Sequence, residues 1–371
     1  MKKNKEVYVT GVGIVSKFGS TINEYWDELN KGKTSEKQNI SVNNQNKEVL
    51  ADILSTKMYE EDYEKYFLDM CCKAILTAAQ DADIDLSGQR GCIIIGTGMG
   101  ISDAFLSLED KPADFMSKLE HKIRKYLKVN IKVLIMANSC CAGAQAIAYA
   151  YDLLNFNDFK FVIAGGVEAF SYITYCGFKR LNSIDETGCK PFDKNRKGIY
   201  VGDGAVFFVL ENRKSEHGYC KMLGQAVTSD AYHIVSPEPG GIQISRAIRQ
   251  ALKQADIKYN EIDAVITHGT GTKLNDIVEA KALYDIFGHI DVTAPKGKIG
   301  HTGGASGAFG LLTAICALKF QCLPYVVNLN ELDESVKISP VMLSKKFKSI
   351  KNIIVNCLAF GGTNTVLVCG A

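Results

Sequence analysis

Residues 133–147 read VLIMANSCCAGAQAI and join a short apolar run to an alanine-rich stretch through a turn of small residues. The run from Val133 to Met136 is apolar throughout, which is typical of a strand that is buried on both faces. The stretch from Ala142 to Leu154 is rich in alanine and leucine, which favours a helix. A buried strand that turns directly into a helix is the repeating unit of a layered α/β fold.

The same alternation recurs along the chain on both sides of this stretch. Apolar runs that end in small residues predict further strands at residues 7–9, 92–95, 161–164, 206–210, 264–267, 353–355 and 366–368. Helical stretches are predicted at residues 24–29, 63–82, 142–154, 244–255, 276–287 and 308–320. The two halves repeat one pattern, so we expect an internal duplication, with one half at residues 1–225 and the other at 226–371.

Composition excludes several classes of protein. The chain has 371 residues, of which 46% are hydrophobic and 23% charged, so it can bury a large core and is not disordered. Its formal net charge of +2 gives no general attraction to nucleic acid or to a membrane surface, and no apolar run approaches the roughly 18 residues of a spanning helix. None of the twelve cysteines forms a C-x-x-C pair, which predicts a reducing, cytoplasmic location and no metal site.

Cys140 stands where a nucleophile would be expected. It follows a predicted strand and precedes a predicted helix, so the positive end of the helix dipole should lower its pKa. The small neighbours leave room for a substrate carbonyl, and backbone N–H groups of the turn can hold an oxyanion. The alternative is a packed core thiol, which is the commoner role of a cysteine.

Two of the six histidines lie among glycines at predicted strand ends. His268 opens the sequence HGTGT, and His301 lies within residues 296–307, which read KGKIGHTGGASG. Together with Cys140 they suggest a convergent Cys-His-His site. Asp276 or Glu279, at the start of the following helix, could pair with Lys296. No phosphate-binding glycine loop is present, since Gly11 and Gly13 lack the third glycine of a dinucleotide motif.

These motifs, in this order, resemble the β-ketoacyl-acyl-carrier-protein synthases of the thiolase fold, closest to the elongating type of fatty-acid and type II polyketide synthesis. The resemblance covers nearly the whole chain. It rests on the opening strand at residues 9–15, the cysteine motif at 140–143, PFD at 191–193 with Arg196 and GDGA at 202–205, SDAYH at 229–233, the two histidine motifs, and Asn356 with FGGTN at 360–364.

The resemblance implies a fold of duplicated βαβαβ halves in five layers, αβαβα. It also implies a decarboxylative condensation of a Cys140-bound acyl chain with malonyl-acyl-carrier-protein. Backbone N–H groups of Cys140 and Phe360 would hold the oxyanion, while His268 and His301 would stabilise the enolate. Lys296, paired with Glu279, would orient the site. Thr270 and Thr272 would contact the phosphopantetheine arm of the carrier protein. Because the carrier protein brings this arm, the resemblance implies no other cofactor.

The implied partners are an acyl carrier protein and a second subunit, which is either another copy or a related chain-length factor. A carrier protein is acidic, so a basic surface should dock it. Lys122 and Lys125 fall on one face of a predicted helix, and this face is either a docking surface or simply a solvated basic surface. Lys179 and Arg180 form a second candidate docking site.

Several residues depart from the pattern of the family. Cys141 replaces a small alanine, Ala359 replaces the first glycine of the loop before Phe360, and Gly303 stands where a leucine is common. Residues 102–130 match the family poorly, which leaves the acyl chain length open. Two further functions remain as alternatives: a non-catalytic partner subunit of the chain-length-factor kind, and a malonyl-acyl-carrier-protein decarboxylase. The presence of Cys140, His268 and His301 argues against both.

Overall fold

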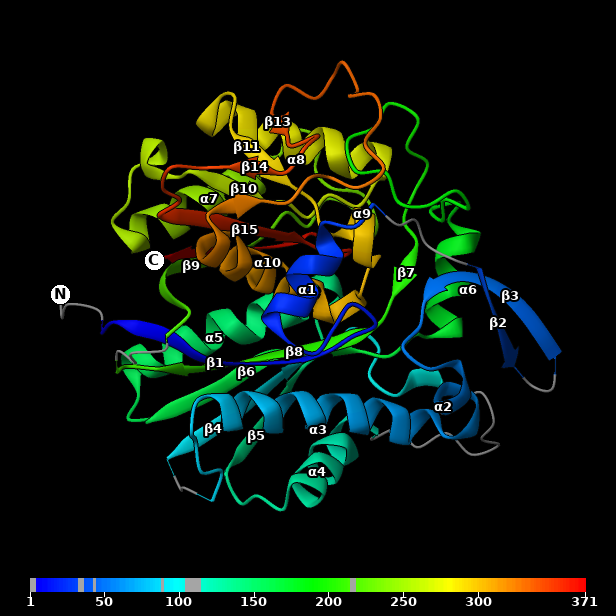
Figure 1. Ribbon diagram of the computed structural model, residues 1–371, viewed down its shortest axis with the longest axis vertical. Helices are drawn as coiled ribbons and strands as arrows, with labels where there is room; N and C mark the ends of the chain where they lie inside the picture. The colour runs from blue at the N-terminus through cyan, green and yellow to red at the C-terminus, as the bar shows by residue number, and fades with distance from the viewer. Residues whose placement is uncertain (1–4, 33–36, 43–44, 88–89, 104–114, 214–217) are drawn as a thin grey trace.

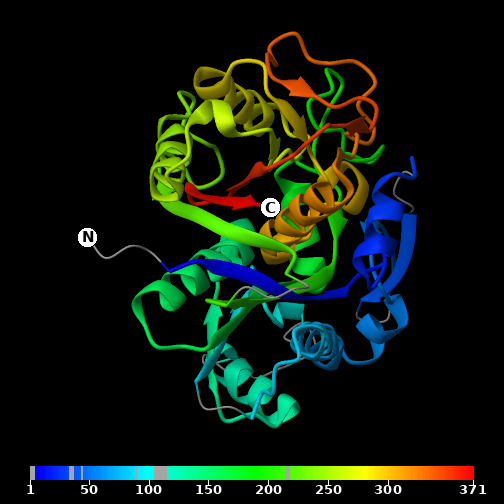
Figure 2. The same ribbon diagram turned by 60° about the vertical axis from the view of Figure 1, so that its left-hand side comes forward.

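The computed structural model of the protein describes residues 5–32, 37–42, 45–87, 90–103, 115–213 and 218–371. Its helices and strands stack in five layers, in which two sheets enclose a central pair of helices and further helices cover the outer faces (Figure 1). The turned view shows the central helix, in orange, between the red strands of one sheet and the blue first strand of the other (Figure 2). The predicted five-layer α/β architecture is confirmed.

Each half of the chain supplies five main strands to one sheet, and the second half adds one short edge strand. The first sheet has the order β1 (Val7–Val15), β8 (Gly204–Glu211), β6 (Phe161–Glu168), β4 (Gly91–Gly96) and β5 (Lys132–Met136). The second has the order β9 (Cys220–Ser229), β16 (Thr363–Gly370), β15 (Asn352–Leu358), β10 (Ala264–Ile266) and β11 (Asp291–Thr293), with β13 (Ser339–Pro340) at its edge. The start of β1 pairs with β9 and joins both sheets into one ladder of 11 strands.

The two sheets share one topology. In each, the first and last strands of the half lie side by side, and the second strand lies between the third and the fourth. The strand directions also agree, because the pairs β1–β8 and β8–β6 are antiparallel, as are β9–β16 and β16–β15, whereas β6–β4–β5 and β15–β10–β11 run parallel. This repetition is the expected internal duplication. The boundary after residue 225 falls inside β9 and stays a prediction.

Helices separate and cover the sheets. The central layer holds α5 (Ala142–Phe156) and α10 (Ser306–Phe320), each of which follows the third strand of its half. The outer layers hold α3 (Tyr63–Asp81) and α4 (Phe115–Leu127) on one side, and α7 (Ile242–Ala255) and α8 (Lys273–Phe287) on the other. Shorter elements are α1 (Ile22–Leu29), α2 (Thr56–Glu61), α6 (Tyr172–Arg180), α9 (Lys296–Ile299), β7 (Val201–Gly202), β12 (Cys322–Leu323), β14 (Lys345–Lys346) and the 3₁₀ turns η2 (Ser139–Cys141), η3 (Tyr259–Glu261) and η4 (Gly303–Ala305).

Successive residues of the central strands enter different cores, which explains their unbroken apolar runs. In β4, Ile94 packs in the core between the two sheets, whereas Ile93 and Ile95 pack in the core beneath α3. In β15, Ile353 faces the central core and Ile354 faces the core beneath α7 and α8. Burial on both faces therefore fixes the layer order.

The polar, Asn- and Gln-rich composition of residues 39–47 is typical of a surface loop, but residues 39–42 and 45–47 belong to two paired strands. Strand β2 (Lys37–Val42) pairs with β3 (Gln45–Asp52), because Ile40 and Val49 on these strands are buried and outweigh the Asn- and Gln-rich composition. Within the described ranges, Gly303–Phe320 alone has the length and composition of a membrane-spanning helix. It is 83% buried inside the protein as the helix of the central layer.

The contact between β1 and α3 leaves no room for a side chain at Gly13. A Cβ atom there would lie 1.9 Å from the carbonyl oxygen of Ala74. We expect Gly13→Ala to lower the free energy of unfolding by about 1–3 kcal/mol through overpacking, seen as a lower Tm in a thermal melt. Gly177→Ala is the matched control, since a Cβ atom at Gly177 would meet nothing within 4 Å. Equal melting of the two variants would contradict this packing.

Candidate active site

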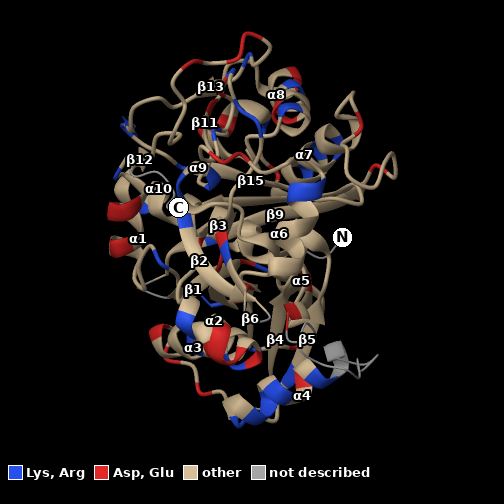
Figure 3. Ribbon diagram, turned by 90° about the vertical axis from the view of Figure 1, so that its right-hand side faces the viewer, with Lys and Arg blue, Asp and Glu red and all other residues tan. Residues whose placement is uncertain are grey.

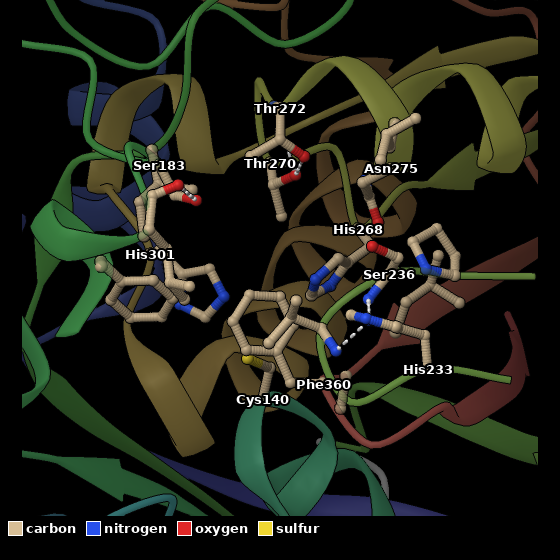
Figure 4. A pocket seen from close by; sticks show the side chains of 18 of the residues that line it. Cys140, Ser183, His233, Ser236, His268, Thr270, Thr272, Asn275, His301 and Phe360 are labelled. Atoms are coloured by element: carbon tan, nitrogen blue, oxygen red, sulfur yellow. Dashed lines mark hydrogen bonds between the residues drawn. The ribbon is translucent and has the colours of Figure 1, made fainter. Parts of the chain in front are cut away.

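Six of the residues singled out from the sequence line one pocket of about 480 Å³. The pocket lies where strand ends of the two halves meet, and it is lined by Cys140, His268, Thr270, Thr272, His301 and Phe360 among others. The close view shows the Cys140 sulfur, both imidazole rings and the Phe360 ring around one space (Figure 4). The structure therefore brings Cys140, His268 and His301 together in one pocket, as the sequence predicts.

The position of Cys140 depends on a strained turn. After β5, the chain enters η2 through Ser139, which has a φ of 47°, a left-handed conformation that is uncommon for a residue with a side chain. Helix α5 begins two residues after Cys140, at Ala142. The turn directs Cys140 to the floor of the pocket, with only 9% of the residue exposed.

The predicted fall in the pKa of Cys140 is wrong. Burial is the main cause that brings the pKa of this thiol to about 12, and the nearby Cys357 and Glu168 act in the same direction. The charge of Lys296 and a backbone hydrogen bond from Phe360 lower it, but they do not offset the loss of solvent. Desolvation disfavours the charged form more than the short reach of a helix terminus favours it. Cys140 therefore rests as a thiol.

The backbone of His268 is held by a buried carboxylate. Glu279, on α8, accepts hydrogen bonds from the N–H groups of His268 at 2.7 Å and Gly269 at 2.9 Å, and from the Asn356 side chain at 2.6 Å. Glu279 has no exposed surface, and burial raises its pKa to about 7. One helical turn away, Asp276 accepts from the next two N–H groups of the same loop, at 3.1 and 3.2 Å.

Lys296 does not form the predicted ion pair with Glu279. Its Nζ donates to the backbone carbonyl of His268 at 2.6 Å and lies 3.2 Å from Nδ1 of the same residue. Lys296 and Glu279 thus contact different atoms of His268. The lysine contacts its carbonyl oxygen and its ring, and the carboxylate accepts its backbone N–H. Because an ammonium group only donates, Nδ1 of His268 accepts, and the ring proton is on Nε2.

His301 has the same tautomer for a different reason. Its Nδ1 accepts the backbone N–H of Gly303 at 3.0 Å, so the ring proton is again on Nε2. Burial and the Lys296 charge lower the pKa of His301 to about 3, and burial holds the pKa of His268 well below its usual value. The rings stand edge to face with centroids 5.8 Å apart. The pocket therefore presents two neutral N–H donors.

Phe360 contributes its backbone and its ring to the site. Its N–H forms a hydrogen bond with the Cys140 sulfur, and it lies in the loop between β15 and β16. Its ring packs against that of Phe178, with centroids 5.8 Å apart, and 38% of the residue is exposed. Phe178 also packs against His301, a contact that the sequence does not reveal.

The remaining predicted residues divide into those at the pocket and those away from it. The hydroxyl groups of Thr270 and Thr272 lie 2.9 Å apart on the wall of the pocket. Lys179 and Arg180 are exposed at the end of α6, beside the pocket residues Phe178 and Leu181. Lys122 and Lys125 are on α4 and do not line the pocket, and Lys122 pairs with Glu64. Figure 3 shows several basic positions along α4 in the outer layer.

One buried acid was missed in the sequence. Glu168 ends β6, and its charge acts on Cys140. The available signal was an acidic residue at the carboxyl end of a buried, glycine-rich strand, residues 161–168, which is where sites lie in parallel α/β sheets. In the described part of the chain, no group of three or more His, Cys, Asp or Glu side chains is arranged to hold a metal ion.

Comparisons with known proteins agree with this geometry. Residues 62–216 match the family model of the β-ketoacyl synthase N-terminal domain, and residues 219–330 match that of the C-terminal domain. A 3-oxoacyl-[acyl-carrier-protein] synthase 2 of Synechocystis is 26% identical, and the match covers 98% of each chain.

Two solved structures share the fold over the full length of both chains. One is the ishigamide ketosynthase/chain length factor, with a TM-score of 0.85 and 25% identity. The other is a type II polyketide synthase acyl-carrier protein in complex with its ketosynthase, also with a TM-score of 0.85, at 21% identity.

The depressed pKa values give a prediction that does not depend on substrate. Neither ring should take up a proton between about pH 5 and pH 8, and both should carry the proton on Nε2, because each Nδ1 is occupied. Long-range ¹H–¹⁵N spectra of histidine-labelled protein measure both properties. Since unfolded histidine binds a proton near pH 6.5 and folded His301 does so only at about 3, stability should fall as the pH drops through this window.

The same protein unfolded in urea is the control, because its histidines should titrate near the ordinary histidine pKa of about 6.5. A proton on Nδ1 of His301, or a titration of either pocket ring near pH 6.5, would contradict the arrangement described.

Proposed function

Because this chain belongs to the β-ketoacyl synthase family, we propose that it catalyses the decarboxylative condensation of an acyl group with malonyl-acyl-carrier-protein, in fatty-acid or type II polyketide synthesis. The observation that carries this proposal is the meeting of one thiol, two neutral imidazole N–H donors and a backbone N–H in a single pocket. The product is a β-ketoacyl thioester that is two carbons longer than the acyl group.

In the first step, Cys140 is the nucleophile. Its sulfur attacks the carbonyl carbon of the acyl thioester, and the proton of the resting thiol leaves with the phosphopantetheine thiolate. The N–H groups of Cys140 and Phe360 hold the negative oxygen of the tetrahedral intermediate. The hydrogen bond from Phe360 to the sulfur supports this role, since that N–H already points at the reacting atom. Loss of one such donor costs about 3 kcal/mol of barrier height.

In the second step, His268 and His301 act as hydrogen-bond donors and not as acids. The malonyl thioester oxygen receives both Nε2–H groups, so negative charge can build on it as the C–C bond to the carboxylate breaks and CO₂ leaves. The enolate carbon then attacks the acyl-Cys140 carbonyl and expels the Cys140 thiolate, which takes a proton from solvent and returns to the resting thiol. Neutral rings suit this role, because a donor that stays protonated stabilises the enolate without quenching it.

Lys296 and Glu279 are proposed to position His268. The lysine holds the carbonyl and ring of His268, and the carboxylate holds its N–H. Thr270 and Thr272 line the pocket and offer hydroxyl groups to the amides of the phosphopantetheine arm. Every group used so far comes from this chain, so the proposed chemistry needs no metal or organic cofactor beyond the arm that the carrier protein brings.

The proposed partners are an acyl carrier protein and a second ketosynthase-like subunit. Lys179 and Arg180 are the better placed of the candidate docking residues, because they are exposed and stand between the pocket-lining residues Phe178 and Leu181. Lys122 already has a carboxylate partner, and Lys125 shares its distant helix. The edge of β5 has no neighbouring strand within the described sheet and is proposed as the contact with another copy or with a chain-length factor.

The location is proposed to be cytoplasmic. All twelve cysteines are free, including Cys141 directly beside Cys140 and Cys357 behind it. The Cys357 thiol donates to the backbone carbonyl of Cys140 at 3.2 Å, and the Cys141 thiol donates to that of Cys357 at 3.1 Å. Three thiols this close remain separate only where disulfides do not persist.

The test combines acyl-carrier protein, malonyl-carrier protein and the purified enzyme. Wild type should gain the mass of the acyl group and then release the extended β-ketoacyl carrier protein, both seen by intact mass spectrometry. Cys140→Ala should show neither, since it lacks the sulfur that forms the thioester. Cys141→Ala is the matched control and should show both. Equal acyl labelling of Cys140→Ala would overturn the nucleophile assignment, and acylation of wild type without any extended product would overturn the condensation.

A further inference from the structure

Glu168 is a buried carboxylate that no step above uses. Only 7% of the residue is exposed. Its Oε2 accepts the backbone N–H groups of Gly98 and Gly304, each at 2.6 Å, and its Oε1 accepts the N–H of Met99 at 3.0 Å and the hydroxyl of Thr97 at 3.2 Å. It therefore ties the end of β6 to the turn after β4 and to η4, which begins α10.

These contacts fit the ionised form of Glu168. All four partners are donors, and the Thr97 hydroxyl is free to donate because its oxygen also accepts the N–H of Gly100 at 3.0 Å. Burial raises the pKa of Glu168, while the four hydrogen bonds oppose that rise. Three of the four partners are backbone N–H groups, which can only donate, and this favours the carboxylate over the protonated acid.

The surrounding glycines make space for this carboxylate. A Cβ atom at Gly303 would lie 2.5 Å from Oε2, and one at Gly98 would lie 2.7 Å from the same oxygen. Gly303 also has a φ of 48°, which only glycine adopts readily. The position of Glu168 thus explains why a glycine stands at position 303.

The carboxylate reaches both reacting parts of the site. Gly304, which it holds, directly follows Gly303, whose N–H sets the tautomer of His301. The turn η4 also packs against η2, the turn that carries Cys140. The negative charge of Glu168 raises the pKa of the Cys140 thiol. Glu168 thereby affects His301, the proposed donor in decarboxylation, through the geometry of the backbone. It affects Cys140, the proposed nucleophile, through its charge.

We propose that Glu168 is a positioning residue that holds the turn at residues 301–304 for decarboxylation and places a negative charge beside Cys140. The part that concerns decarboxylation rests on the proposed function, whereas the part that concerns the thiol does not. Glu168 does not touch the substrate in this account, and it acts through the backbone of Gly303 and Gly304 and through its field.

Two substitutions separate geometry from charge. Glu168→Gln removes the charge and one acceptor oxygen, while Glu168→Asp keeps the charge but shortens the side chain by one methylene, so that it cannot span from β6 to η4. Both variants should lose malonyl decarboxylation by roughly tenfold to a hundredfold in kcat with little change in KM, since a small misplacement of a catalytic group has effects of this size.

The second readout is the pH dependence of Cys140 alkylation by iodoacetamide, followed by mass spectrometry of the peptide that carries Cys140, because the exposed Cys176 also reacts. In Glu168→Gln, the midpoint should move to lower pH by about one unit, because removal of a nearby negative charge favours the thiolate. In Glu168→Asp, the midpoint should stay near that of wild type. A purely structural role would not produce this split between the two variants.

Asp103→Asn is the matched control. Asp103 is also a buried carboxylate, accepting hydrogen bonds from Tyr59 at 2.9 Å, from Ser171 at 2.7 Å and from backbone N–H groups, but it does not line the pocket. The Asp103→Asn variant should have a lower Tm than wild type but the same pH midpoint of Cys140 alkylation. Its rate of decarboxylation should stay within a few-fold of wild type.

Three outcomes would overturn the proposal: an unchanged midpoint in Glu168→Gln, wild-type decarboxylation in both Glu168 variants, or equal effects in Asp103→Asn. If wild type itself decarboxylates no malonyl thioester, the proposed function fails. The alkylation experiment then still decides whether Glu168 acts on Cys140.

Discussion

The site depends on buried carboxylates that accept backbone N–H groups from the loops at strand ends. Glu279 and Asp276, one turn apart on α8, take the N–H groups of residues 268–271 in order, and Glu168 does the same for Gly98, Met99 and Gly304. An isolated buried carboxylate would cost several kcal/mol, so each of these acids is stable only while its donors are in place. Folding the loops and burying the acids are therefore one event. The loop backbones face inward, and this leaves the side chains of His268 and Thr270 for the pocket.

Duplication explains why the two halves can hold different parts of one reaction. The turns η2 and η4 are equivalent in the repeated topology, since each follows the third strand of its half and leads into a central helix. Each begins with a left-handed residue, Ser139 with a φ of 47° and Gly303 with a φ of 48°. The first half uses this turn to carry Cys140, and the second uses it to orient His301. The two turns pack together because α5 and α10 are neighbours in the central layer. The pocket thus forms at the point where the two repeats meet.

The sequence predicts the elements well and the electrostatics poorly. Apolar runs and helical stretches such as residues 244–255 and 308–320 are local signals, and the structure places α7 and α10 there with nearly the same limits. The residues of the pocket are likewise recognisable, because a cysteine or histidine between glycines at a strand end is a local pattern. The hydrogen-bond partners of these residues, in contrast, come from distant parts of the chain and leave no local pattern in the sequence. The contact of Lys296 with His268, and the hold of Glu168 on Gly304, join segments that are 28 and 136 residues apart in the chain. The predicted direction of the pKa shift at Cys140 was wrong for the same reason, since burial is a property of the whole fold.

The loop at residues 268–271 should be rigid because buried carboxylates hold its backbone, although it belongs to neither a helix nor a sheet. Residue-resolved hydrogen exchange on wild type and on Glu279→Gln tests this most directly. In wild type, all four N–H groups should exchange slowly. In Glu279→Gln, exchange should quicken at His268 and Gly269 while Thr270 and Gly271 stay protected by Asp276. Fast exchange of the whole loop in wild type, or loss of protection at all four positions to the same extent, would contradict the account.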